Sequence, residues 1–91
     1  MGRDNYRTIA RKLSKREEFT GNSMWARWER WEPGYQPEED VYKVYSYSTP
    51  IAWWVYGHKP VLNLRPYSNT TSRHQNLCKA YLTDGDYEEF S

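Results

Sequence analysis

Apolar residues follow two different periods along this chain, and the change of period divides it into elements. Near the N-terminus four of them recur at the spacing of three and four that aligns one face of a helix: Tyr6, Ile9, Ala10 and Leu13. Asp4 or Asn5 can cap this helix. The opposite face is basic. We therefore expect a basic helical segment over residues 1–20, followed by a break at Thr20-Gly21-Asn22-Ser23.

The middle of the chain, residues 23–65, has the composition of β-strands. Residues 41–47, 51–56 and 61–64 are rich in β-branched and aromatic side chains. Thr49-Pro50 separates the first two, because proline cannot donate to an inner ladder, and Gly57-His58 suits a tight turn. Residues 24–31 suit either a helix or a strand, since their tryptophans are three apart. The flanking Gly21 and Pro33-Gly34 favour a strand.

A second helix is expected over residues 70–83. Ser72 and Gln75 form the S-x-x-Q pattern of a capping box, in which each side chain bonds the backbone N–H of the other residue. The expected structural cap comprises Thr70, Thr71, Ser72 and Gln75. The acidic tail, residues 84–91, is expected to be loose. The prediction is one small α+β domain, with an antiparallel meander of three or four strands packed against one or two short helices.

Composition changes this picture in one respect. Val, Ile, Leu and Phe together supply only 13 of the 91 residues, whereas there are five Trp and nine Tyr. So few aliphatic residues are typical of disorder when net charge is high, but the net charge here is +1 and aromatic residues make up 18%. We therefore expect a folded domain whose core is built mainly from rings. No run is long enough to cross a membrane, and the expected location is cytoplasmic.

Candidate catalytic chemistry is sparse. His74 and Cys78 are four residues apart and could share a metal with His58, but this set falls short of the usual ligand patterns. Ser72, His74 and Cys78 include a nucleophile and a base, yet nothing resembles a nucleophile elbow. The glycines never cluster into a phosphate loop. We expect no enzyme activity, no cofactor and no metal, and we name no catalytic residue.

The aromatic residues and arginines point instead to binding, since they dominate interface hot spots. Trp53 and Trp54 are adjacent, so a strand would turn them to opposite faces. The predicted partner-binding residues are Trp25, Trp28, Trp31, Trp53, Trp54, Arg73 and His74. The alternative is a nucleic acid, held by exposed sheet aromatics and a basic helix. Its phosphate contacts would be Arg7, Arg11, Lys12, Lys15 and Arg16.

Two stretches also carry a resemblance. Residues 44–53 contain Tyr-Ser-Tyr-Ser-Thr-Pro-Ile-Ala, and residues 67–75 read Tyr-Ser-Asn-Thr-Thr-Ser-Arg-His-Gln. They resemble small proteins of unknown function encoded by actinobacterial bacteriophages and mobile elements. The resemblance implies a phage accessory protein in the bacterial cytoplasm. Its expected partner is a host or phage protein, and a second copy of this chain is the alternative partner. Two interpretations of the second motif, residues 67–75, stay open. The motif either starts the helix or forms an anion-binding surface that includes Arg73 and His74.

Overall fold

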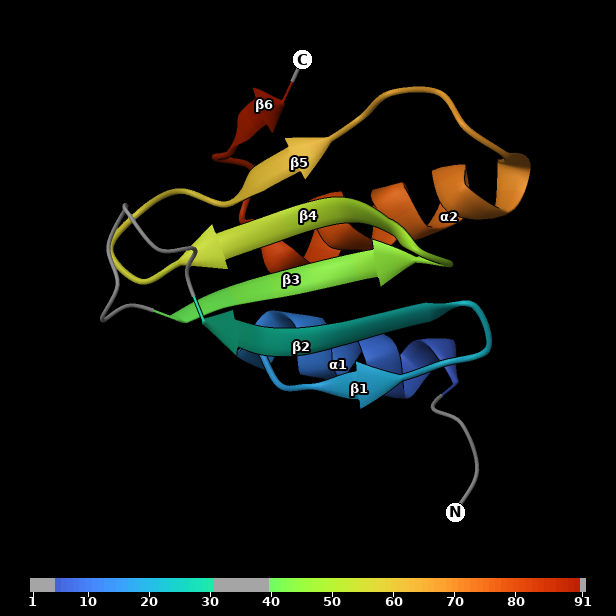
Figure 1. Ribbon diagram of the computed structural model, residues 1–91, viewed down its shortest axis with the longest axis horizontal. Coiled ribbons are helices and arrows are strands. Elements are labelled where there is room, and N and C mark those ends of the chain that lie inside the picture. Colours follow the sequence, from blue (N-terminus) through green and yellow to red (C-terminus); the bar gives the residue numbers. More distant parts are fainter. Residues whose placement is uncertain (1–4, 31–39, 91) are drawn as a thin grey trace.

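Six strands form one mixed sheet, and two helices cover one of its faces (Figure 1). The computed structural model describes residues 5–30 and 40–90. The elements in chain order are α1 (Tyr6–Lys15), β1 (Phe19–Thr20), β2 (Met24–Arg30), β3 (Asp40–Ser46), β4 (Thr49–Val55), β5 (Val61–Asn63), α2 (Asn69–Leu77), the π-helical turn η1 (Cys78–Leu82) and β6 (Glu88–Phe90).

Strands β1 to β5 form an antiparallel meander in chain order, and β6 returns to lie parallel to β5 after α2 and η1. The α+β class and the strand at residues 24–30 are confirmed. The expected count of three or four strands is wrong, because β1 and β6 were not predicted. Both are very short, and β6 lies in the acidic tail that was expected to be loose. Its charged Glu88 and Glu89 give little strand signal.

Register assigns each side chain of the central strands to one of two faces. Ala26 is opposite Val44, and Val44 is opposite Ala52, and all three are buried beneath the helices. The neighbouring positions on β2 and β3, such as Trp25 and Tyr45, point away from the helices because side chains alternate along a strand. We call the sheet surface turned away from α1 and α2 the open face.

The prediction that Thr49-Pro50 interrupts the sheet is wrong. Tyr47 takes the left-handed conformation with φ of 58° in the turn before β4, and β4 already includes Thr49 and Pro50. Tyr45 pairs with Pro50 and Val44 pairs with Ala52, so Ile51 is the extra residue of a β-bulge. The bulge allows Ile51 and Ala52 to be buried together, although they are adjacent in sequence.

The first helix begins as predicted. The Asn5 side chain accepts a hydrogen bond of 2.9 Å from the backbone N–H of Thr8, which satisfies a donor that the helix leaves free. Ile9 and Leu13 are buried against the sheet. Arg16 ends the helix with φ of 56°, and its N–H donates to the Leu13 carbonyl oxygen. Asp4, the alternative cap, lies outside the described residues.

The N-cap of the second helix lies four residues before Ser72, the N-cap of the predicted capping box. Ser68 is the N-cap, and its side chain accepts from the N–H of Thr71 at 3.1 Å. The box itself is a wrong prediction: Ser72 is an exposed residue inside the helix. Gln75 is buried and donates to the carbonyl oxygens of Asn63 and Arg65, at 2.7 and 2.9 Å. These two hydrogen bonds of Gln75 hold α2 against the end of β5.

The core lies between the sheet and the helices and is mostly aliphatic. Among the described Phe, Tyr and Trp residues, only Phe19 and Tyr42 are fully buried. The expectation that most rings form the core is therefore wrong. A sheet covered by helices on one face offers a single core layer, and the other described Phe, Tyr and Trp rings are partly buried or exposed on both sides of the sheet. Among the described residues, no helix is long and apolar enough to cross a bilayer.

The outer edge of β2 is closed by a side chain. Strand β1 pairs with β2 only at Trp25 and Ala26, so Trp28 has no strand partner on that side. The Glu18 carboxylate accepts a hydrogen bond of 2.9 Å from the Trp28 backbone N–H. A side chain thus completes the ladder where β1 ends.

Candidate functional site

A stacked ring pair stands on the open face. Trp25 and Tyr45 are directly opposed across β2 and β3, and their rings are parallel within 6°, with centroids 4.0 Å apart. The Arg27 guanidinium lies over the Trp25 ring, 5.2 Å from its centroid. Because Tyr45 occupies one face of the indole, Arg27 covers the other. The indole N–H donates to the Tyr47 carbonyl oxygen at 2.7 Å, which fixes the ring further.

Polar contacts hold Tyr45 in place. Its hydroxyl donates to a Glu29 carboxylate oxygen at 2.7 Å, and Lys43 Nζ lies 3.6 Å from the other oxygen. Partial burial, followed by the hydrogen bond and the charge of Glu29, raises the pKa of Tyr45 to about 12. Tyr45 therefore stays protonated at neutral pH and keeps its place beside Trp25.

A second ring pair lies across the open face. The Trp53 and Phe90 rings meet edge to face, with centroids 5.2 Å apart, and Arg65 lies over the Phe90 ring at 5.1 Å. Phe90 comes from β6, so the unpredicted strand completes this end of the face. The open face carries two ring pairs, each with one guanidinium over a ring, formed by Trp25, Tyr45, Arg27, Trp53, Phe90 and Arg65.

Trp28 and Trp54 belong to the opposite side of the sheet. Their rings meet near edge to face at 5.9 Å, and Arg16 packs over Trp54 at 4.1 Å from the ring centroid. The Trp28 indole N–H donates to the Arg16 carbonyl oxygen at 2.9 Å. These contacts hold the C-terminal end of α1 against the sheet, so both rings have structural partners.

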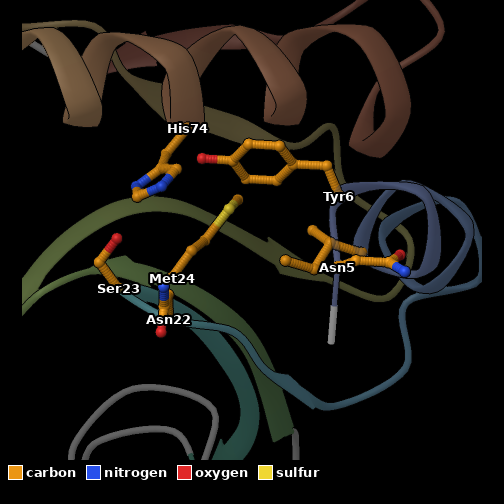
Figure 2. Close-up of a pocket in the computed structure, with 7 residues that line it drawn as sticks. Asn5, Tyr6, Asn22, Ser23, Met24 and His74 are labelled. Carbon is orange, nitrogen blue, oxygen red and sulfur yellow. The ribbon is translucent and has the colours of Figure 1, made fainter. Parts of the chain in front are cut away.

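A cavity of about 410 Å³ opens between the start of α1, the turn before β2 and α2 (Figure 2). Its lining combines polar and apolar side chains, from Asn5, Tyr6, Ile9, Asn22, Ser23, Met24 and His74. In the close-up the Tyr6 hydroxyl is turned toward the His74 ring, and the two ring centroids are 6.3 Å apart. The cavity lies on the helix side of the sheet, away from the open face.

His74 sits at the end of a buried chain of hydroxyl groups. Its Nδ1 lies 2.7 Å from the Ser46 Oγ, which lies 2.9 Å from the Thr71 Oγ1. Burial, with a smaller contribution from the charge of Arg73, lowers the pKa of His74. The Ser46–His74 contact has the elements of a nucleophile and base, but Ser46 is buried and does not line the cavity. Its position suits a structural role.

The structure divides the predicted partner-binding residues among three places. Trp25 and Trp53 lie on the open face, whereas Trp28 and Trp54 lie on the helix side. His74 is buried and Arg73 is exposed on α2. Trp31 lies outside the described residues.

Four residues of the open face were missed. Arg27, Tyr45, Arg65 and Phe90 contribute to its ring pairs. Because side chains alternate along a strand, Arg27 shares a face with Trp25 of the same strand. Only the register of β2 against β3 shows that Tyr45 lies opposite Trp25. No sequence signal marked Phe90 as part of a strand.

The basic residues of the N-terminal helix lie away from the open face, because α1 packs on the other side of the sheet (Figure 1). Arg7, Arg11 and Lys15 are exposed there. Arg16 is partly buried and donates to the Leu82 carbonyl oxygen at 3.3 Å. A ligand bound to the open-face rings would therefore not meet these cations. Within residues 5–30 and 40–90, no group of three His, Cys, Asp or Glu side chains is placed to hold a metal.

A family model described as a family of unknown function (DUF8033) matches residues 8–90, which include all of the strands and α2. No curated protein matches the chain, and no solved structure matches it.

Proposed function

The chain belongs to the DUF8033 family of unknown function, and we propose that it is a non-catalytic binding protein that holds an acidic protein partner on its open face. One observation carries the proposal: two ring pairs stand on the same face, and each has an arginine over a ring. Aromatic residues and arginine are the residue types that supply most of the binding free energy at protein interfaces.

The charges of the open face favour an acidic partner. Arg27 and Arg65 make no ion pair among the described residues, whereas Lys43 is paired with Glu29. The two arginines can therefore donate hydrogen bonds to carboxylates from outside the chain, and their planar groups suit bidentate pairing. Stacking on the rings restrains both guanidinium groups and lowers the conformational entropy lost on binding.

A protein is favoured over a single-stranded nucleic acid by the geometry of the rings. A nucleobase needs a free ring face on which to stack. Tyr45 covers one face of the Trp25 indole and Arg27 covers the other. The phosphate contacts of that alternative lie mainly on α1, across the sheet from the rings. Side chains of a protein can instead pack on ring edges and pair with the guanidinium groups.

The test compares two charge reversals of the same chemistry on opposite sides of the molecule. Arg27→Glu changes the open face, and Arg11→Glu changes an exposed position of α1. Immobilised wild-type and variant proteins are exposed to lysate of the native cells, and captured proteins are quantified by mass spectrometry. Binding of each captured protein is then measured with purified components, after circular dichroism shows that both variants are folded.

We expect an acidic protein that binds wild type and Arg11→Glu alike and binds Arg27→Glu at least tenfold more weakly. Equal binding by all three proteins would remove the open face from the interface. A fluorescent oligonucleotide is titrated in parallel between about 50 and 200 mM salt. Tight oligonucleotide binding that Arg27→Glu abolishes would overturn the proposal in favour of nucleic acid.

A further inference from the structure

The buried ring of His74 has one nitrogen without a partner. The residue is only 1% exposed, and its Nδ1 is engaged by Ser46. Its Nε2 makes no hydrogen bond with any described residue, although the ring forms part of the wall of the cavity (Figure 2). Nε2 is not fully enclosed, since Arg16 Nε is the only fully buried side-chain nitrogen or oxygen without a partner among the described residues. Water or a ligand in the cavity can therefore reach Nε2 and form a hydrogen bond with it.

The hydroxyl chain is compatible with a ring hydrogen on Nε2. Ser68 donates to the Thr71 Oγ1 at 3.2 Å, and the Ser46 Oγ lies 2.9 Å from the Thr71 Oγ1 and 2.7 Å from His74 Nδ1. A serine hydroxyl can donate to a ring nitrogen or accept from it. When Ser46 donates to Nδ1, the neutral ring carries its hydrogen on Nε2. The lowered pKa of His74 favours the neutral ring, and in this tautomer Nε2–H is a donor.

The rest of the cavity is also suited to a negatively charged acceptor. The Tyr6 hydroxyl turns toward His74 and makes no hydrogen bond with another described residue (Figure 2). Both groups lie beside the start of α1, where the helix dipole favours an anion and the first turn has no acidic residue. None of the lining residues is acidic. Arg73, the neighbour of His74, adds a positive charge that acts on the ring.

We propose that this cavity binds a small organic acid, whose carboxylate accepts hydrogen bonds from His74 Nε2–H and the Tyr6 hydroxyl. The apolar part of the ligand packs on Ile9 and Met24, which line the same cavity. The volume of about 410 Å³ is within the range of sites for small molecules. This site is independent of the open face, so either proposal can fail without the other.

The probe is 3-phenylpropanoate, and its carboxamide is the matched control without charge. Both are titrated into ¹⁵N-labelled wild-type protein, and amide shifts of Ser23 and His74 are followed. For a probe of this size we expect a Kd of about 1 mM. The carboxamide should bind about tenfold more weakly, because hydrogen bonds to a charged acceptor are stronger. Equal affinities, or no saturable shift at either residue, would overturn the proposal.

Two tyrosine variants test the donor. Tyr6→Phe removes the hydroxyl at the cavity, and Tyr56→Phe makes the same change at a ring that is 81% exposed and does not line it. Both sites are on the surface, so both variants should fold. Tyr6→Phe should weaken binding about fivefold, and Tyr56→Phe should leave it unchanged. Equal effects of the two variants, or imidazole ¹⁵N shifts that place the hydrogen on Nδ1, would contradict the assigned donors.

Discussion

At the scale of single residues, His74 links the second helix to the middle of the sheet. Its ring belongs to α2, the hydroxyl that contacts Nδ1 belongs to Ser46 at the end of β3, and Thr71 returns the chain to α2. Each member is buried, so loss of one partner leaves a polar group without a hydrogen bond. Burial, with a smaller contribution from the charge of Arg73, disfavours the charged form of this imidazole.

The protein should therefore lose stability as the pH falls below about 6.5, the ordinary pKa of histidine. Burial and the charge of Arg73 lower the pKa of His74 in the folded state. Between the lowered and the ordinary value the unfolded chain binds more protons, so stability is complete above this interval and declines through it on acidification. Urea unfolding at a series of pH values measures the decline.

The control for this prediction separates the two histidines. His58→Gln changes an exposed residue and should retain the pH dependence, whereas His74→Gln should flatten it whatever its effect on stability at pH 7. The same slope in His74→Gln as in wild type would show that another group is responsible.

At the scale of elements, the sequence predicts the long strands and the first helix correctly, because alternation and helical spacing are local signals. The start of α2 is a different case. Ser68 and Ser72 are both followed by polar residues, and only packing of Gln75 against the end of β5 places Ser72 inside the helix. β6 could not be predicted because its pairing with Val61–Asn63 depends on the course of α2 and η1.

Ser68→Ala should destabilise the protein by about 1 kcal/mol, the usual cost of an N-cap that loses its side-chain acceptor. Ser72→Ala is the matched control, since Ser72 is exposed in the helix and alanine has the higher helix propensity. Chemical denaturation compares the two free energies of unfolding. A larger loss from Ser72→Ala would restore the capping box as the start of the helix.

At the scale of the whole molecule, a single layer of helices explains where the rings lie. With one face of the sheet covered, Trp25 and Trp53 remain on the other. The sequence pattern alone could identify them as more rings than a single small core can bury. The side chains that contact these two rings depend on the register of the strands and on β6. Neither could be predicted from the sequence. The cytoplasmic, phage-type role stays a prediction.

Cys78 offers a direct measure of global unfolding. It is the single cysteine of the chain, it is fully buried in the core, and burial raises the pKa of its thiol. A thiol reagent should therefore react slowly in native buffer, and the rate should increase with urea in parallel with the unfolded fraction. Rapid reaction without denaturant would show that η1 opens separately from the sheet.

The Glu18 carboxylate over the Trp28 N–H has a consequence for behaviour in concentrated solution. Unpaired strand edges recruit strands from other molecules, which leads to aggregation. Here the donor beyond the end of β1 is already engaged, and a second molecule approaching this edge would also have to displace a negative charge. The carboxylate thus opposes the pairing of another molecule's strand with β2 beyond the end of β1, while the open face stays available for binding.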